Sequence, residues 1–176
     1  MRLSALGRYA LRAMVDLALH QGETPVLRRD IVERQGISGD YLAHLFGKLK
    51  QARLVESVMG PGGGYTLARN PGDITAADVL RAVDEQLDPV FCVEVEPETS
   101  CSHADTCVTH LLWGRLGKAI MDLLDTVTLA ELCEQAQWLR AEHAVAAPLN
   151  RDTLDDRLQQ WDEYRTGRIL YDGSGI

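Results

Sequence analysis

Three cysteines and a histidine lie close together in the second half of the chain, at Cys92, Cys101, Cys107 and His110. Thiolate and imidazole groups are the ligands that hold zinc ions and iron–sulfur clusters in proteins. Structural zinc sites generally use tight Cys-x-x-Cys pairs, whereas the gaps between these four residues are eight, five and two residues. The spacing therefore favours a metal site, and an iron–sulfur cluster over a single zinc ion.

Cys107 and His110 stand at the start of an apolar run with helical periodicity. Residues at positions i and i+3 of a first helical turn lie on one face of the helix. Both side chains can therefore reach the same metal centre.

The cysteines have two other interpretations, disulfides and redox-active thiols. The N-terminus carries Arg2 and Arg8 and lacks the apolar core and cleavage site of a secretory signal. We therefore expect a cytoplasmic protein, where structural disulfides are rare, so redox-active thiols are the main alternative. Cys133 stands apart in a helical pattern, and we expect it to be a buried core thiol.

Composition predicts a soluble chain with a hydrophobic core and an uneven charge. The chain has 176 residues, 45% of them hydrophobic, and no apolar run as long as a membrane span. The net charge of −8 combines +2 in residues 1–80 with −10 in residues 81–176. Because phosphate contacts need only a local basic face, the acidic total does not exclude nucleic-acid binding.

The first half of the chain predicts a helix-turn-helix. Apolar spacing predicts a helix over residues 4–20, a second over 26–35 and a third from Ser38, as its N-cap, to about residue 52. Gly36 suits the left-handed end of the second helix. Two short helices joined by a tight glycine-containing turn are typical of this DNA-binding motif.

A β-hairpin with a glycine-rich tip is predicted directly after the third helix. Residues 54–59 alternate like a strand, residues 60–64 read Gly-Pro-Gly-Gly-Gly, and residues 65–67 return. Glycines permit positive φ angles and let backbone N–H groups approach phosphates, and no Gly-Lys-Ser/Thr follows to make a nucleotide-binding loop. The expected fold is mainly α with a small β-hairpin: a winged helix-turn-helix domain followed by a long dimerisation helix.

The third helix and the hairpin tip are the expected DNA-binding surface. Tyr41 and His44 can exchange hydrogen bonds with bases or phosphates, and Lys48 can lie near a phosphate. Phosphates repel Asp40, but its carboxylate can accept a hydrogen bond from a cytosine amino group. The complete set expected to contact DNA is Arg2, Arg28, Ser38, Asp40, Tyr41, Ala43, His44, Lys48, Gly60, Gly62, Gly63 and Gly64.

The second half predicts a helical dimerisation region and an acidic tail. A helix over residues 74–85 leads to the cysteine loop, and the run over residues 111–124 is apolar on two faces, which favours a subunit interface. Another helix is expected from Thr128 to about residue 141. Leu154, Leu158 and Trp161 indicate a short docking helix or a disordered end.

We expect a DNA-binding domain over 1–80, a cluster loop with dimerisation helices over 81–142, and an acidic extension over 143–176.

Several motifs together resemble one known family over about residues 1–140. They are Met1-Arg-Leu with Gly7-Arg-Tyr-Ala10, Arg34 to Ser38, Tyr41-Leu42, Leu45-Phe46, Gly60 to Tyr65, Ala82 to Glu85, and Cys107-x-x-His110-x-x-Trp113. In combination they resemble the IscR-like iron–sulfur cluster regulators. The resemblance implies a homodimeric winged-helix regulator that binds double-stranded operator DNA. It also implies a [2Fe–2S] cluster held by Cys92, Cys101, Cys107 and His110, and repression of iron–sulfur assembly genes.

The chain departs from this family's pattern at three places. The gap between Cys92 and Cys101 is longer than usual and acidic, which makes His103 a conceivable substitute ligand. Ala43 stands where the family carries a glutamate that helps to choose between operator classes. Met59 stands where an arginine usually precedes the wing, which weakens the expected minor-groove contact.

Other functions compatible with the pattern are nitric-oxide or redox sensing on the same fold, and electron transfer by the same cluster. The nitric-oxide-sensing branch called NsrR can use an N-terminal aspartate as a cluster ligand, where this chain has Arg8, which cannot ligate iron. An electron carrier has no use for the glycine-rich hairpin. A structural zinc site in a regulator is a further alternative. No persuasive catalytic triad or carboxylate pair is present, so we do not expect an enzyme.

Overall fold

A computed structural model of the chain describes residues 3–87, 106–142 and 151–166. The chain divides into two compact units, Met1–Glu131 and Leu132–Ile176. The predicted DNA-binding residue Arg2 and the predicted ligands Cys92 and Cys101 lie outside the described residues, as does His103.

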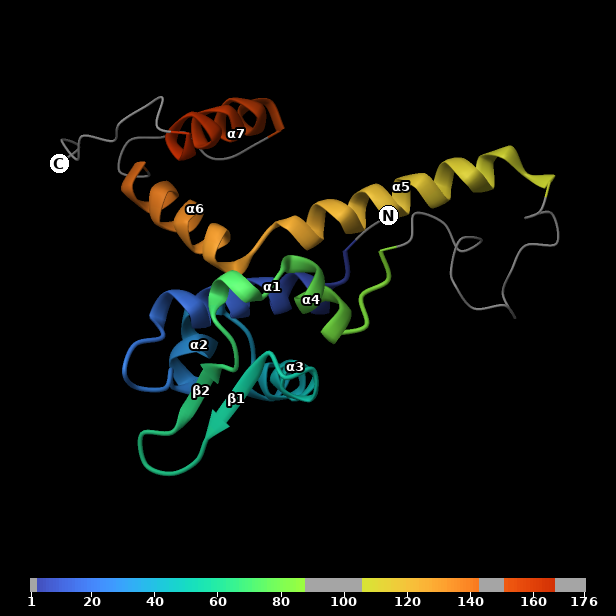
Figure 1. The fold of residues 1–176 in the computed structure, drawn as a ribbon. Coiled ribbons are helices and arrows are strands. Elements are labelled where there is room, and N and C mark those ends of the chain that lie inside the picture. The colour runs from blue at the N-terminus through green and yellow to red at the C-terminus, as the bar shows by residue number, and fades with distance from the viewer. Residues whose placement is uncertain (1–2, 88–105, 143–150, 167–176) are drawn as a thin grey trace. The chain divides into compact units, whose positions relative to one another are not determined.

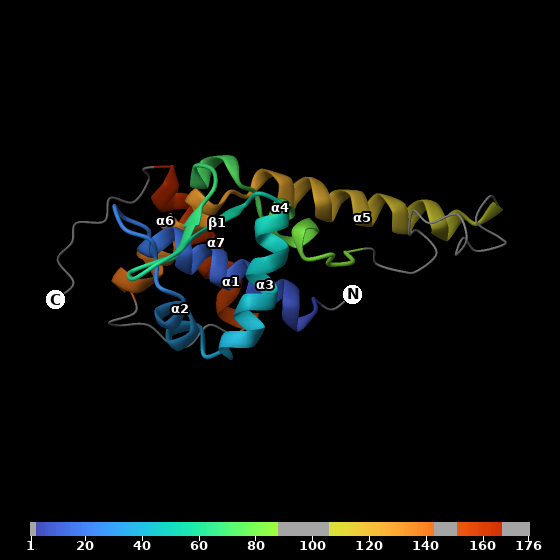
Figure 2. The ribbon, with the colours of Figure 1, turned by 90° about the horizontal axis from the view of Figure 1, so that it is seen from below.

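The first three helices form where the sequence predicts them. They are α1 (Ala5–His20), α2 (Arg28–Gln35) and α3 (Gly39–Gln51). The Ser38 side chain caps α3 by accepting a hydrogen bond from the backbone N–H of Tyr41 (3.2 Å). Gly36 ends α2 with a left-handed φ of 64°. Seen from below, α3 lies across α1 with the hairpin extending beside them (Figure 2).

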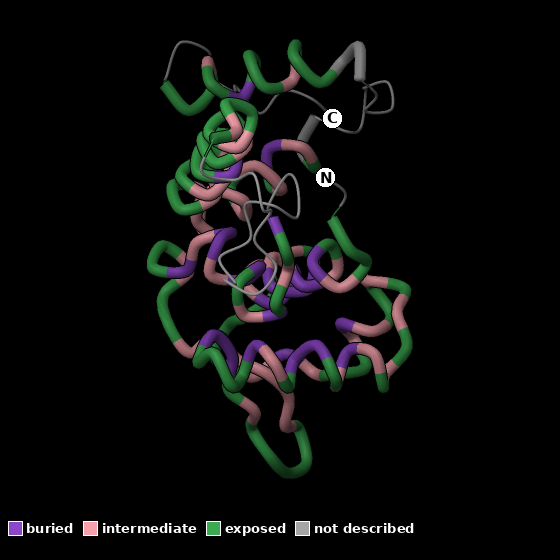
Figure 3. The backbone as a smooth tube through the Cα atoms, turned by 90° about the vertical axis from the view of Figure 1, so that its right-hand side faces the viewer, coloured by how far each residue is buried: buried purple, intermediate pink, exposed green. Residues whose placement is uncertain are grey.

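The hairpin consists of β1 (Val55–Val58) and β2 (Gly64–Leu67), which pair antiparallel with Val55 opposite Leu67. The segment before α2 joins it, because the N–H and C=O groups of Val26 each bond to Tyr65 at 2.9 Å. The tip of the hairpin projects as an exposed loop (Figure 3). The described residues combine helices α1 to α3 with a two-stranded hairpin, so the predicted winged helix-turn-helix fold class is confirmed.

The core of the first unit lies between the helices and the base of the hairpin. Figure 3 shows buried residues in purple, and those of the two helices include Ala10, Met14 and Leu17 of α1 and Leu42, Leu45, Phe46 and Leu49 of α3. The largest fully buried side chains are Phe46, Met14, Leu17, Ile31, Leu42, Leu45, Leu49, Leu54, Ile74, Leu80, Leu129 and Val55. Burial on this scale removes much apolar surface from water and is the main stabilising contribution to such a domain.

A buried ionic cluster fixes α2 against α1. Asp16 is only 4% exposed, and Arg34 donates two hydrogen bonds of 2.8 Å to its two carboxylate oxygens. Gln35 donates a third bond of 3.1 Å to the same carboxylate, and the hydrogen bond from Arg34 to Asp16 raises the pKa of the arginine. Removing one partner of such a buried pair costs about 3 kcal/mol or more, because a buried charge is left unpaired.

The connection after the hairpin is a 3-10 turn (Pro71–Asp73) followed by α4 (Ala76–Ala82). Thr75 and Asp78 cap this helix reciprocally in a capping box. The helix is shorter than the predicted span of 74–85, because Asp84 adopts a left-handed φ of 56° that ends it.

Helix α5 (Val108–Thr126) is the longest helix of the described residues, and its C-terminal part lies beside α4 (Figure 1). Arg81 joins the two helices through bonds of 2.8 and 2.7 Å to the Asp125 carboxylate. This pairing lowers the pKa of Asp125. No helix in the described ranges is long and apolar enough to cross a membrane.

The second unit contains most of α6 (Leu129–Glu142) and all of α7 (Arg151–Arg165). Three aromatic side chains hold it together: the ring centroid of Trp161 lies 6.0 Å from that of Trp138 and 5.6 Å from that of Tyr164. The acidic tail contains a helix of 15 residues, so the predicted alternative of a disordered end is wrong for residues 151–165, and docking by this helix stays a prediction.

Candidate DNA-binding surface and metal site

The outer face of α3 carries most of the side chains predicted to contact DNA. Ser38, Asp40 and His44 are exposed, and Tyr41, Ala43 and Lys48 are partly exposed. The buried residues Leu42, Leu45, Phe46 and Leu49 occupy the opposite face of the helix. The helix thus presents a polar surface while its apolar stripe anchors it to the core.

Arg28 lies beside the first turn of α3. Its guanidinium Nη2 is 3.7 Å from an Asp40 carboxylate oxygen. A Cβ atom at Gly39 would come within 2.7 Å of the same guanidinium nitrogen, so glycine at this position leaves room for the arginine. Asp40 therefore lies next to a positive charge on the surface where DNA is expected, which offsets its repulsion from phosphates.

Tyr41 contacts Tyr9 of α1, and Arg12 of the same helix contacts Tyr9; the sequence pattern did not indicate either residue. The Tyr41 ring makes an edge contact with Tyr9, with 5.7 Å between centroids. Arg12 lies over the Tyr9 ring at 5.3 Å and donates a hydrogen bond of 3.1 Å to the Gln35 side chain. Only the three-dimensional packing of α1 against α2 and α3 shows this arrangement.

Lys48 has a partner inside the protein. Its Nζ lies 2.5 Å from a carboxylate oxygen of Asp84, in the turn that follows α4, and its side chain is 27% exposed. The residue predicted to lie near a phosphate therefore also ties the C-terminal half of α3 to that turn.

Glycines give the hairpin tip its conformation and its close approach to the core. Gly60 and Gly62 have φ angles of 108° and 81°, which residues with a Cβ rarely adopt. A Cβ at Gly64 would lie 2.1 Å from the backbone oxygen of Val26. The glycine-rich sequence is thus required both for the turn and for the backbone pairing with Val26.

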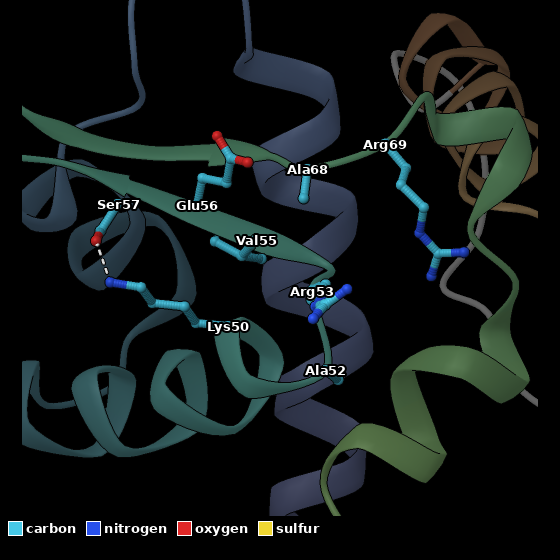
Figure 4. A pocket seen from close by; sticks show the side chains of 8 residues that line it. All are labelled: Lys50, Ala52, Arg53, Val55, Glu56, Ser57, Ala68 and Arg69. Carbon is cyan, nitrogen blue, oxygen red and sulfur yellow. Dashed lines mark hydrogen bonds between the residues drawn. The ribbon is translucent and has the colours of Figure 1, made fainter.

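A cleft at the base of the hairpin is lined by charged and apolar side chains, among them Lys50, Arg53 and Arg69 (Figure 4). Lys50, at the end of α3, donates a hydrogen bond of 2.7 Å to Ser57 on β1. Arg53 and Arg69 line the same cleft with Glu56. The Lys50–Ser57 bond fastens the end of α3 to the first strand, and so helps to fix the hairpin relative to that helix.

Cys107 and His110 lie together at the start of α5. Cys107 is the N-cap residue, and the backbone N–H of His110 donates to its carbonyl oxygen at 3.1 Å. The Thr109 hydroxyl lies 3.0 Å from Cys107 Sγ. Hydrogen bonds from the Thr109 side chain and from the backbone N–H of His110 lower the pKa of the Cys107 thiol. The thiolate is the form that binds metals.

His110 has a ring nitrogen without a partner. Its Nδ1 is buried, and the described residues offer it no hydrogen bond. A buried imidazole nitrogen normally has a hydrogen-bond partner or serves as a metal ligand. The unpaired nitrogen, one helical turn from a thiol of lowered pKa, fits a metal or cluster ligand pair. Within the described ranges, no group of three or more potential ligands gathers, and Cys92 and Cys101 lie outside those ranges.

An exposed apolar stripe runs along α5. Leu112, Leu116 and Leu123 are 55%, 42% and 63% exposed, and Val108 and Leu111 are still more exposed. On the other predicted apolar face of the helix, Ile120 and Leu124 are partly covered. Contiguous exposed apolar surface of this kind marks an interaction site.

Comparison with known proteins identifies the family. The profile of Rrf2, described as an iron-dependent transcriptional regulator, matches residues 3–135. The chain belongs to the Rrf2 family. It is therefore a transcription regulator of the IscR type and not an enzyme.

Similar relatives and solved structures agree with this assignment. The HTH-type transcriptional regulator IscR of Pectobacterium atrosepticum is 44% identical over 160 residues, covering 91% of this chain and 95% of that protein. IscR of Xenorhabdus nematophila is 47% identical over 139 residues, covering 79% and 83%. The structure of T. potens IscR is 38% identical with a TM-score of 0.63, covering 85% of this chain and 94% of that one. The global cysteine regulator CymR of B. subtilis is 34% identical with a TM-score of 0.63, covering 76% and 97%.

The two described cysteines of this Rrf2-family chain should differ in reactivity. Hydrogen bonds lower the pKa of Cys107, whereas burial raises the pKa of Cys133. Because the thiolate is the nucleophile, iodoacetamide should label Cys107 at a lower pH than Cys133 in metal-free protein. Site-resolved mass spectrometry of samples labelled across a pH series measures both profiles. A Cys133 profile that rises at the lower pH would contradict the assignment of Cys107.

Proposed function

We propose that the protein is a homodimeric cytoplasmic repressor that binds operator DNA and senses iron–sulfur status through a [2Fe–2S] cluster. Cys92, Cys101, Cys107 and His110 would hold the cluster, and iron–sulfur assembly genes are the proposed targets. Residues 1–80 would bind DNA, residues 81–142 would carry the cluster and the dimer contact, and residues 143–176 would form an acidic extension.

The observation that carries the proposal is the start of α5. Cys107 and His110 share one helical turn, and the buried His110 Nδ1 has no hydrogen-bond partner among the described residues. Nitrogen and sulfur ligands of this kind hold iron–sulfur clusters. The presence of a bound cluster would depend on the supply of iron and sulfide. The two relatives named above are IscR regulators, which fits the same assignment.

DNA binding is proposed at α3 and the hairpin tip. The N-terminal half of α3 presents Asp40, Tyr41 and His44, the part of a recognition helix that reads base edges. Arg28 lies beside it, and the glycines of the tip allow the backbone to approach the DNA. At Ala43 the methyl side chain offers no carboxylate to discriminate between operator classes, so any such choice would depend on other residues.

The exposed stripe of α5 is the proposed dimer contact, and a single charge within it tests this. Leu112→Asp should raise the dissociation constant of the dimer by about tenfold or more, because a carboxylate would be buried without a partner. Leu158→Asp is the matched control, since Leu158 on α7 is 52% exposed and Leu112 is 55% exposed. Analytical ultracentrifugation gives the dimer constant for each. Equal effects of the two variants, or a monomeric parent protein, would remove the dimer from the proposal.

Loss of one cluster ligand tests the coupling between cluster and DNA. Cys92→Ala should abolish visible absorbance and change operator affinity by about fivefold or more, the usual size of an allosteric coupling. The probe is a duplex selected from a randomised library by the cluster-loaded full-length protein, and its binding should weaken steeply with salt. Cys133→Ala is the control and should change neither property. Unchanged operator affinity in Cys92→Ala would refute the sensing function.

A further inference from the structure

The turn that ends α4 has an unusual residue at its central position. The N–H of Glu85 bonds to the carbonyl of Leu80 (3.0 Å), and the N–H of Asp84 bonds to that of Arg81 (3.1 Å). This pattern is a Schellman motif, whose left-handed position is usually glycine. Asp84 occupies it at a φ of 56°. Aspartate is among the residues that tolerate this conformation, and here its carboxylate reaches Lys48 of α3.

Three residues between positions 81 and 85 make side-chain contacts, each with a different helix. The Asp84 carboxylate pairs with Lys48 of α3 at 2.5 Å. The Glu85 carboxylate accepts a bond of 2.6 Å from the backbone N–H of Ser4, and a second bond from the Ser4 hydroxyl, at the N-terminus of α1. Arg81 pairs with Asp125 of α5. Charged groups thus join the end of α4 to the recognition helix, to α1 and to the helix that carries Cys107 and His110.

The close approach of Glu85 to α1 depends on a small residue. A Cβ at Gly7 would lie 2.5 Å from a Glu85 carboxylate oxygen. A negative charge at this helix N-terminus is also favoured by the helix dipole. The sequence therefore provides both the space and the electrostatic attraction for this contact.

We propose that Asp84 and Glu85 are positioning residues that transmit the state of the cysteine loop to the DNA-binding surface. The inference rests on the proposed function. Glu85 stands seven residues before the proposed ligand Cys92 in the chain. Arg81 binds Asp125 near the C-terminal end of α5, the helix whose start carries the proposed ligands Cys107 and His110. A change at either place alters the constraint on this turn, and Asp84 passes that change to α3 through Lys48.

The experiment compares operator binding by cluster-loaded and cluster-free full-length protein, using the library-selected duplex as probe. Asp84→Asn removes the charge, and asparagine tolerates the left-handed backbone. Asp84→Gly relaxes the backbone and removes the whole side chain. An exposed ion pair of this kind changes an equilibrium constant by up to about fivefold. In both variants the ratio of the operator dissociation constants of cluster-loaded and cluster-free protein should move towards one, by at most that factor. Visible absorbance and resistance to urea should be retained.

The control is Asp162→Asn, which breaks an ion pair with Arg165 within α7 and should leave the ratio unchanged. A parent ratio retained in both Asp84 variants would overturn the inference, and so would a parallel loss of both affinities, which indicates a purely structural role. Glu85→Gln is the second variant, for use if an Asp84 variant fails to fold, and it should also move the ratio towards one. A ratio of one in the parent protein would instead refute the proposed function, and the inference with it.

Discussion

The orientation of the DNA-binding helices depends on one buried carboxylate. Asp16 is almost fully inside the protein, where a charge is stable only when it is paired and hydrogen-bonded. Arg34 and Gln35 at the end of α2 supply that pairing. Because the glycine turn after Gln35 leads directly into α3, this contact sets the position of α2 and, through it, the start of the recognition helix.

The recognition helix is held at both ends and along one face. Its N-terminal turn contacts Arg28 and α1 through Tyr41 and Tyr9, its C-terminal half is tied to Asp84, and Phe46 packs on Tyr65 of the hairpin with 4.4 Å between ring centroids. A helix constrained in this way moves with its neighbours. Those neighbours include the turn that ends α4 and, through the bond from Arg81 to Asp125, the C-terminal end of α5.

Much of this arrangement follows from local sequence, and the rest does not. Apolar periodicity, the Ser38 cap, Gly36 and the glycine-rich tip predict the helices and the hairpin, because each signal acts within one or two turns of chain. The pairs Asp16–Arg34, Lys48–Asp84 and Ser4–Glu85 join residues 18, 36 and 81 positions apart, and no local pattern indicates them. The predicted helix over residues 74–85 extends past the observed end of α4 at Ala82. Its end was not predicted because an aspartate in a left-handed conformation does not give the stop signal that a glycine would. For the metal site, spacing predicted that Cys107 and His110 would share a turn, and the positions of Cys92 and Cys101 stay predictions.

The central claim is that an iron–sulfur cluster uses the unpaired imidazole and the thiol at the start of α5. The most direct measurement is a visible absorption spectrum of anaerobically purified protein, combined with analysis of iron, sulfide and zinc. We expect a red-brown protein with equal amounts of iron and sulfide and no zinc, and a spectrum that changes in His110→Ala. A colourless protein that contains zinc, or one that contains no metal at all, would contradict this claim.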